Sequence, residues 1–491
     1  MLFNSPVFIA FFVCVFALYW AIRARVPQNA LVLAASYVFY GAWSWKFLAL
    51  LIASTLIDYA CGQLIAAART PARRRLVMVA SVTANLAFLA TFKYLGFFVR
   101  QAADLLTALG FQANLPVLQI VLPIGISFYT FQTIGYVVDV YRGKVPAERN
   151  LLNYALFVAF FPQLVAGPIE RAANMLPQFA RDRVFRWPAF ESGLQLAVWG
   201  LFKKIVIADN LAPFVNVVYE RPEAYDGSAL AAATVFFAFQ IYCDFSGYTD
   251  TARGVARMLG FELIRNFDNP YSSRTPVEFW RRWHMSLSQW FQDYLYFPLA
   301  MRFMRKGGWA SRYRAHIVSM TLIGFWHGAN WTFVVFGLYW GVIIALYLYA
   351  AERLAADGAV SESGSLMRAI PGPLRGALAV GGMFIVVCVG WVFFRAQSMS
   401  DAWHVLTHAL SGAGASTVLR LDVQREAVLW ALIVGLLAIE WAARARPSLR
   451  AALVGGGPSA VLARSALVFA ILFSYLAMQQ GVVQPFIYFQ F

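Results

Sequence analysis

The stretch Gly324-Phe325-Trp326-His327-Gly328-Ala329-Asn330-Trp331 places an ionisable imidazole between two apolar segments. Residues 314–327 lead into it and residues 331–351 follow it, and both segments are typical of membrane helices. An ionisable group at membrane depth is costly, so it marks a functional site by default. The nearby glycines allow another backbone or a ligand to approach closely. The stretch therefore predicts a helical membrane fold with a candidate site at His327, although a histidine bonded inside a helix bundle would give the same pattern.

The composition extends this prediction to the whole chain. Of its 491 residues, 60% are hydrophobic and 13% are charged, whereas a soluble globular domain carries roughly 25% charged residues. Apolar runs of nearly spanning length recur throughout, which predicts an all-α polytopic integral membrane protein. The predicted spans lie near 7–23, 29–44, 47–67, 76–98, 151–166, 190–208, 228–245, 314–327, 331–351, 377–395, 427–443 and 462–480.

Charge and cysteine usage narrow the function classes. The formal net charge of +16 comes from short basic clusters between apolar spans, which indicates contact with lipid headgroups and gives no support to nucleic-acid binding. A second use of this charge is holding a polyanionic cytosolic donor. The four cysteines are far apart and form no CxxC pair, so we expect neither a metal site nor a disulfide framework.

The chain is expected to form a single membrane domain over residues 1–491, with a polar linker near 355–376 before a C-terminal helical group. Residues 115–140 carry two prolines and two glycines, and residues 244–300 are too polar for lipid. Both segments are therefore expected to be re-entrant or interfacial and buried in protein. The chain has no evident internal repeat, which weakens the interpretation as a glycan transporter or flippase.

Residues 279–294 combine tryptophans, arginines and a histidine. On a helix, seven of them, including Trp283, His284 and Trp290, would share one face by 3/4 spacing. This pattern favours an amphipathic interfacial anchor with His284 as a hydrogen-bonded core residue. The alternative is that His284 lines a reaction chamber and that Arg281 and Arg282 bind an anionic substrate.

Two further segments place carboxylates beside apolar spans. Asp244 and Asp250 lie within seven positions, and a buried carboxylate needs a partner. They could orient a histidine or brace an arginine, but helix capping and turn formation explain the pattern equally well. The second segment is Gly167-Pro168-Ile169-Glu170-Arg171, which on its own indicates only the end of a helix.

The C-terminus is Phe486-Ile487-Tyr488-Phe489-Gln490-Phe491. Most chains end in a polar, frayed tail, so an aromatic hexapeptide directly after a span is unusual. On composition alone it favours an interfacial aromatic belt.

At residues 279–294 and 324–331 the sequence resembles the membrane-bound O-acyltransferase family. The bacterial branch that O-acetylates polysaccharides, with alginate as its typical polymer, is the most similar. The resemblance extends over essentially the whole chain and includes Leu122–Gln132, Phe161–Ile169 and Tyr242–Asp250. The order of the five blocks, with Arg-Arg-Trp-His and Trp-His-Gly among them, makes it specific.

The resemblance implies a ring of about 11–12 transmembrane helices around a central funnel, in the bacterial inner membrane. His327 corresponds to the essential histidine of the family and His284 to a second, more variable histidine. Tyr488 corresponds to a proposed acyl carrier. The implied donor is cytosolic acetyl-CoA, with no bound cofactor, and a periplasmic acetyltransferase is the implied partner.

Histidine accepts protons near neutral pH, so we expect His327 to act as a general base. Asp244, Asp250 and Asn330 are expected to support it, and Arg281 and Arg282 to bind donor phosphates. Alginate is the first candidate polymer. The alternatives are bacterial cellulose, peptidoglycan, and D-alanyl transfer to teichoic acid.

Overall fold

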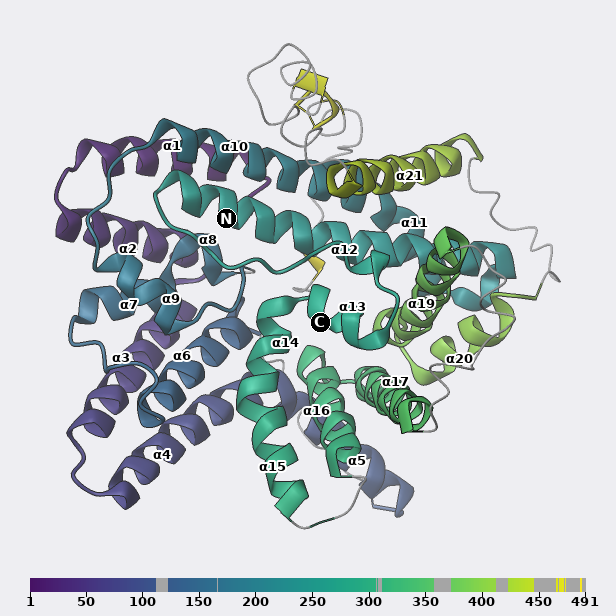
Figure 1. Cartoon of the computed structure of the whole chain (residues 1–491), viewed down its shortest axis with the longest axis horizontal. Coiled ribbons are helices and arrows are strands. Elements are labelled where there is room, and N and C mark those ends of the chain that lie inside the picture. Colours follow the sequence, from purple (N-terminus) through teal and green to yellow (C-terminus); the bar gives the residue numbers. More distant parts are fainter. Residues whose placement is uncertain are drawn as a thin grey trace. The chain divides into compact units, whose positions relative to one another are not determined.

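The computed structural model describes residues 1–111, 122–165, 167–305, 307, 311–356, 372–411, 423–445, 465–466, 468–471, 473 and 486–487. Within these residues every regular element is helical (Figure 1). Five of the described helical stretches are long and apolar enough to cross a membrane, namely 45–67, 71–108, 227–258, 331–354 and 372–395. The prediction of an all-α polytopic membrane protein is confirmed, and the ring of helices around a funnel stays a prediction.

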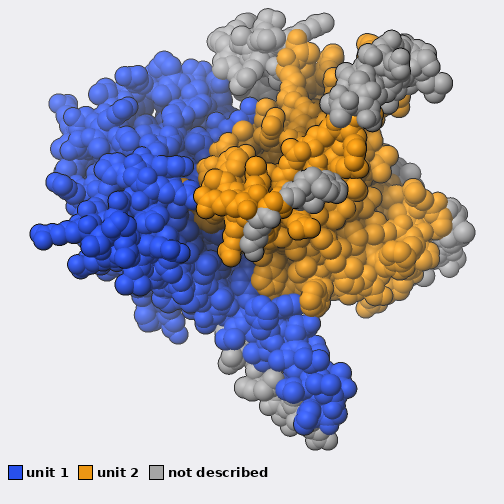
Figure 2. Space-filling view, turned by 60° about the horizontal axis from the view of Figure 1, so that its bottom comes forward, with its two compact units in different colours: residues 1–201, 248–265 blue, residues 202–247, 266–491 orange. Residues whose placement is uncertain are grey.

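The chain forms two compact units, coloured separately in Figure 2. Unit 1 comprises residues 1–201 and 248–265, and unit 2 comprises residues 202–247 and 266–491. The single-domain organisation stays a prediction. Residues 357–371 of its expected polar linker lie outside the described residues.

Unit 1 consists of helices joined by short turns. In chain order they are α1 (Pro6–Ala21), α2 (Arg25–Gly41), α3 (Trp45–Ala67), α4 (Pro71–Leu89), the π-helix η1 (Ala90–Tyr94), α5 (Leu95–Ala108), α6 (Ile126–Tyr141), α7 (Leu151–Ala159), α8 (Phe161–Leu164), α9 (Ala172–Phe179) and α10 (Trp187–Leu201).

Several helices begin at a hydroxyl residue followed by proline. Ser5 accepts a hydrogen bond from the Phe8 amide at 3.2 Å and Thr70 one from the Arg73 amide at 3.3 Å. Proline at the next position gives up an amide that has no helical partner. These signals set the starts of α1 and α4.

Two polar clusters join the helices of unit 1. Asp58 on α3 accepts from the Ser81 hydroxyl at 2.6 Å and from the Asn85 amide at 2.9 Å, both on α4. Asn29 on α2 donates to Asn153 on α7 at 3.0 Å. Because each buried polar group has a partner, these contacts fix the packing of the helices without leaving an unsatisfied group.

Unit 2 contains the remaining elements. They are η2 (Phe202–Ala208), α11 (Asp209–Glu220), η3 (Pro222–Ala224), α12 (Gly227–Met258, up to Gly247), η4 (Pro270–Ser272), α13 (Pro276–Arg282), α14 (Met285–Phe291), η5 (Gln292–Tyr296), α15 (Phe297–Arg305), α16 (Ser311–His327), α17 (Trp331–Ala356), α19 (Gly372–Arg395), α20 (Met399–His408) and α21 (Val423–Ala445).

Glycines allow α16 and α17 to pack closely against each other. A Cβ atom at Gly341 would lie 2.7 Å from the Ile317 Cα, and one at Gly324 or Gly337 would collide with the backbone of the facing helix. Gly337 and Gly341 form a Gly-x-x-x-Gly pattern, which permits this approach in membrane helices. The close packing of α16 and α17 fixes the loop 328–330 that joins them. His327 is the last residue of α16, directly before this loop.

The long helix α12 is the most enclosed of the candidate spans. Of its most apolar window 78% is buried, whereas only 17% is buried in the candidate span 71–108. A helix that is apolar and buried all round belongs to a protein core. Polar residues on α12 therefore face protein, where they need partners.

Candidate active site

His327 lies in an aromatic cage inside unit 2. Its side chain is buried, and its ring centroid lies 4.7 Å from Trp326, 5.0 Å from Phe394 on α19 and 6.1 Å from Phe336 on α17. Three helices therefore supply the walls around one imidazole. Surroundings of this kind have a low dielectric constant, which strengthens electrostatic interactions at the ring.

Asn330 holds the turn that follows His327. Its side-chain oxygen accepts from the Thr332 amide at 3.2 Å, which caps the start of α17. Its side-chain nitrogen donates to the Gln397 carbonyl at 2.9 Å, in the turn between α19 and α20. Asn330 therefore joins the two segments that carry His327 and its neighbour Phe394.

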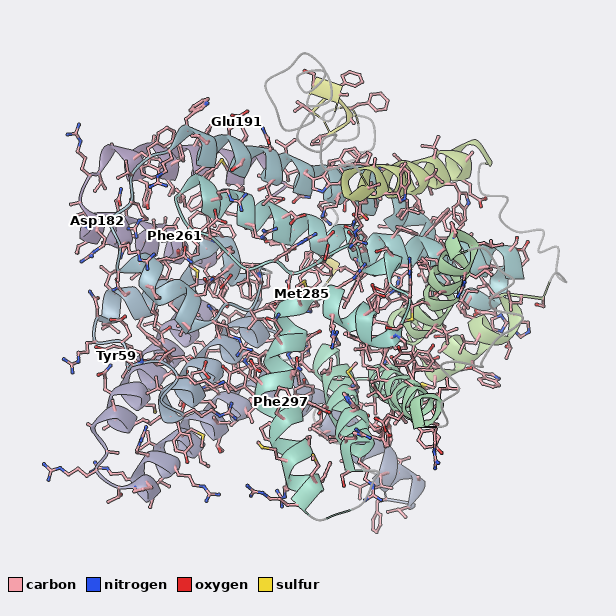
Figure 3. The ribbon with its side chains drawn as sticks, in the orientation of Figure 1. Tyr59, Asp182, Glu191, Phe261, Met285 and Phe297 are labelled. Atoms are coloured by element: carbon pink, nitrogen blue, oxygen red, sulfur yellow. The ribbon has the colours of Figure 1, made fainter. Side chains whose placement is uncertain are left out.

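The predicted continuous helix over residues 279–294 is wrong. The structure breaks it after Arg282, and α14 starts at Met285, which is labelled in Figure 3. Between them His284 adopts a left-handed backbone conformation with φ of +41°. Such a conformation is uncommon for a residue other than glycine and needs support from its surroundings.

Asn266 provides that support, and no pattern in the sequence points to this residue. The Asn266 carbonyl accepts from the Met285 amide at 2.8 Å, and its side-chain oxygen accepts from the Ser286 amide at 3.1 Å and the Ser286 hydroxyl at 2.8 Å. These bonds satisfy the free amides at the start of α14. They fix the turn that directs His284 into the core.

His284 is fully buried and shares a neighbour with His327. Its ring meets Phe245 on α12 edge to face at 4.6 Å and lies 6.4 Å from Trp326. Trp326 is also in ring contact with His327. The two predicted histidines thus share one indole as a neighbour, rather than one face of one helix.

A buried lysine pairs with two carboxylates, one of which is Asp244, the residue before Phe245 on α12. Lys204 in the π-helix η2 pairs with Asp244 at 2.5 Å and with Asp209 at 2.7 Å. Its neighbour Lys203 donates to Ser246 at 2.9 Å. The sequence reasoning missed both lysines, although two cations inside the predicted span 190–208 were a signal for a functional cluster.

The remaining predicted residues have separate surroundings. Asp250 belongs to unit 1, where it pairs with Arg253 at 3.2 Å. Arg282 pairs with Glu278 at 2.6 Å and donates to Ser272 at 2.7 Å. Arg281 is exposed. Phosphate binding by either arginine stays a prediction.

Glu170 in unit 1 does more than follow a helix end. Its carboxylate accepts from the Ile264 amide at 2.6 Å and from Asn174 at 2.8 Å. Burial raises the pKa of Glu170 to about 7, and the two hydrogen bonds oppose this rise. The residue connects the turn after α8 to the segment after α12 within unit 1.

Tyr488 lies outside the described residues, but the two residues before it are described. The Ile487 amide donates to Asp244 at 2.6 Å, and the Phe486 ring lies 5.6 Å from Phe245. Asp244 therefore holds Lys204 with one oxygen and the C-terminal segment with the other.

The arrangement suits acid–base chemistry at a carbonyl. Among the described residues no group of three or more histidines, cysteines or carboxylates could hold a metal ion. Burial lowers the pKa of His284 to about 3 from its ordinary value of 6.5, so this ring is neutral at physiological pH. An imidazole with so low a pKa is a weak proton acceptor at neutral pH, so the general-base role falls to His327 rather than to His284.

We expect a His284→Gln variant to lose less thermal stability than the parent protein between pH 7 and pH 5. Unfolded His284 takes up a proton below pH 6.5, whereas folded His284, with a pKa of about 3, does not. Above pH 6.5 both states are neutral at this residue and the free energy of unfolding is at its full value. From pH 6.5 toward pH 3 only the unfolded state binds the proton, so the free energy of unfolding falls by about 1.4 kcal/mol per pH unit. Thermal unfolding in detergent measures the difference, with His408→Gln as the control on an exposed histidine. Equal losses in parent and variant would contradict this.

Comparisons with known proteins cover most of the chain, including the segment that carries both histidines. The model of the membrane-bound O-acyltransferase family matches residues 146–356, which include both histidines. The chain is 41% identical to a probable alginate O-acetylase of Azotobacter vinelandii, over 82% of this chain and 77% of that protein. It is 35% identical to a probable alginate O-acetylase of Pseudomonas putida over the full length of both. A peptidoglycan O-acetyltransferase of Helicobacter pylori is 33% identical over 83% of this chain and 79% of its own length.

Proposed function

The chain belongs to the membrane-bound O-acyltransferase family, and we propose that it passes acetyl groups from cytosolic acetyl-CoA across the bacterial inner membrane to an exported polysaccharide. O-acyltransferase activity follows from the family. The donor, the membrane, the polymer and the route are the proposed part. In this proposal a periplasmic acetyltransferase completes the transfer to the polymer.

The observation that carries the proposal is the enclosure of His327 by Trp326, Phe336 and Phe394 within the matched range. Such a site excludes water, which would otherwise hydrolyse a thioester or an ester intermediate. It also holds one basic nitrogen in a fixed orientation. These are the requirements for acyl transfer between two hydroxyl or thiol groups.

We assign His327 the role of general base in the first transfer. The attacking hydroxyl loses its proton to His327 as its oxygen bonds to the thioester carbonyl carbon. The carbon–sulfur bond then breaks, and the leaving thiolate takes the proton back from the imidazolium. Acetyl-CoA is too highly charged to cross a bilayer, whereas the acetyl group is small and neutral, so only the acetyl group needs to pass through the protein.

The attacking hydroxyl in this proposal is that of Tyr488. A phenol has a pKa of about 10 and a thiol one of about 8.5, so an aryl acetate keeps much of the activation of the thioester. The phenolic ester can then give its acetyl group to an alkyl hydroxyl on a sugar or on the partner protein. The second step regenerates the phenol.

Alginate is the polymer best supported, because the Azotobacter and Pseudomonas relatives are both probable alginate O-acetylases. Peptidoglycan is a second candidate. It is supported by the Helicobacter relative, whose identity of 33% is close to the 35% of the Pseudomonas protein.

Purified protein in proteoliposomes is expected to incorporate labelled CoA into unlabelled acetyl-CoA without any polymer present. Such exchange requires a covalent acetyl intermediate that reverts to the thioester, which is a mark of two-step transfer. A glycan transporter would produce no exchange. Absence of exchange in protein that is folded and inserted would contradict the two-step route.

Deleting the gene in its host shows which polymer depends on this protein for its acetyl esters. Loss of acetyl esters from alginate supports the first candidate, and loss from peptidoglycan supports the second. Unchanged acetylation of every cell-surface polymer would contradict the proposal. Restoration by the intact gene is the control.

A further inference from the structure

Two residues close to the end of the chain, Phe486 and Ile487, are held in the core of unit 2. Phe486 is 1% exposed and Ile487 is 3% exposed. The Ile487 amide donates to the Asp244 carboxylate at 2.6 Å, and the Phe486 ring packs 5.6 Å from Phe245. Two adjacent residues of α12 thus hold two adjacent residues of the C-terminal segment. A main-chain amide bonded to a buried carboxylate is a strong, charge-assisted contact.

Lys204 compensates the charge of Asp244 and orients its carboxylate for this contact. One Asp244 oxygen pairs with the Lys204 ammonium at 2.5 Å, and the other accepts from Ile487. Lys204 is fixed in turn by Asp209 at 2.7 Å. A buried carboxylate must be compensated by a partner, and Lys204 compensates Asp244 while leaving one oxygen directed at the C-terminal segment.

The same part of α12 also reaches the histidine pair. Phe245 meets the His284 ring at 4.6 Å, and His284 and His327 share Trp326 as a neighbour. The contacts of Asp244 and Phe245 therefore place Phe486 and Ile487 next to a residue that also packs on His284.

We propose that Asp244 is a positioning residue that docks the C-terminal segment of this chain through the Ile487 amide. Docking holds Phe486 and Ile487 beside Phe245, whose ring packs on His284, and the transfer reaction at His327 requires the segment in this place. This inference rests on the proposed function in one respect, that the C-terminal segment takes part in acetyl transfer. It gives Asp244 a role distinct from tuning a histidine.

The first test removes only the donor of the contact. Ile487→Pro lacks the amide hydrogen, and Ile487→Ala keeps it while removing the side chain. We expect Ile487→Pro to lower the turnover of acetyl transfer by about 10- to 100-fold, as for loss of a hydrogen bond to a charged group. Its KM for acetyl-CoA should stay unchanged. Ile487→Ala also loses the buried side chain but keeps the amide, so its turnover should remain well above that of Ile487→Pro. Equal losses in the two variants, or none in Ile487→Pro, would overturn the proposal.

The second test removes the acceptor and combines both changes. Asp244→Leu should reduce turnover by a similar factor, and the double variant Asp244→Leu/Ile487→Pro should be no slower than the slower single variant. Two changes that remove the same contact are not additive. Multiplied losses in the double variant would show that the two residues act separately and would overturn the proposal.

A third measurement separates this inference from the proposed function. Hydrogen exchange followed by mass spectrometry should show a protected C-terminal peptide in the parent and in Ile487→Ala, and faster exchange in Ile487→Pro and Asp244→Leu. This readout needs no donor, polymer or partner. Protection that depends on Asp244 would support docking even if acetyl-CoA proved to be the wrong donor. Protection that is the same in all four proteins would overturn it.

Discussion

Replacing His327 with glutamine is expected to lower acetyl transfer by about 10²–10⁴-fold, which is the usual contribution of a general base. Glutamine has a similar size and can occupy the space between Trp326, Phe336 and Phe394. Its amide cannot accept a proton at neutral pH, so the attacking hydroxyl would have to lose its proton without help. Both CoA exchange and acetylation of the polymer measure the effect.

The control for this variant is the same change at a histidine outside the cage. His408 is exposed on α20, and His408→Gln should leave transfer unchanged. Thermal unfolding of the His327→Gln protein in detergent verifies that it is folded. A folded His327→Gln protein that transfers acetyl groups at the parent rate would remove His327 from the mechanism.

The α16–α17 hairpin could be predicted from the sequence because its signals are local. The expected spans 314–327 and 331–351 correspond to helices over Ser311–His327 and Trp331–Ala356. Long apolar runs fix the two helices, and a short polar break with Asn330 as a capping residue fixes the turn. His327 was identified for the same reason, because a single ionisable residue in an apolar run is visible without any knowledge of its neighbours.

The turn at His284 could not be predicted because its cause is distant in sequence. The 3/4 spacing of aromatic residues continues through residues 279–294 and favours one helix. The break depends on hydrogen bonds that Asn266 accepts from the start of α14, and Asn266 lies 18 residues before His284. Periodicity describes which face of a helix is apolar, but it does not report a competing partner from another segment.

The partner of Asp244 shows the same limit. A carboxylate leaving an apolar span indicated that a partner must exist, and arginines or a histidine were the candidates. The structure supplies Lys204 and a main-chain amide 243 residues away. Side-chain chemistry in a sequence cannot reveal a main-chain donor, since every residue except proline carries one.

Tyr488→Phe is expected to abolish CoA exchange and to reduce polymer acetylation to background, with no change in thermal unfolding. The change keeps the aromatic ring and removes only the hydroxyl that attacks the thioester in the proposed route. Phenylalanine offers no atom to carry the acetyl group, so the loss should exceed that from Ile487→Pro, which displaces the nucleophile without removing it. Mass spectrometry of the C-terminal peptide should find an added acetyl group in the parent and none in the variant.

The matched control is Tyr347→Phe, which removes one hydroxyl from an exposed tyrosine on α17. It should exchange CoA and acetylate the polymer at the parent rates. Full polymer acetylation by Tyr488→Phe would eliminate the carrier and leave direct transfer from the thioester to the partner. The turnover of Ile487→Pro then distinguishes a docking role of the segment from a carrier role of Tyr488. If Tyr488 is not the carrier but Ile487→Pro still slows transfer, the docking of Ile487 on Asp244 matters for transfer without supplying the nucleophile.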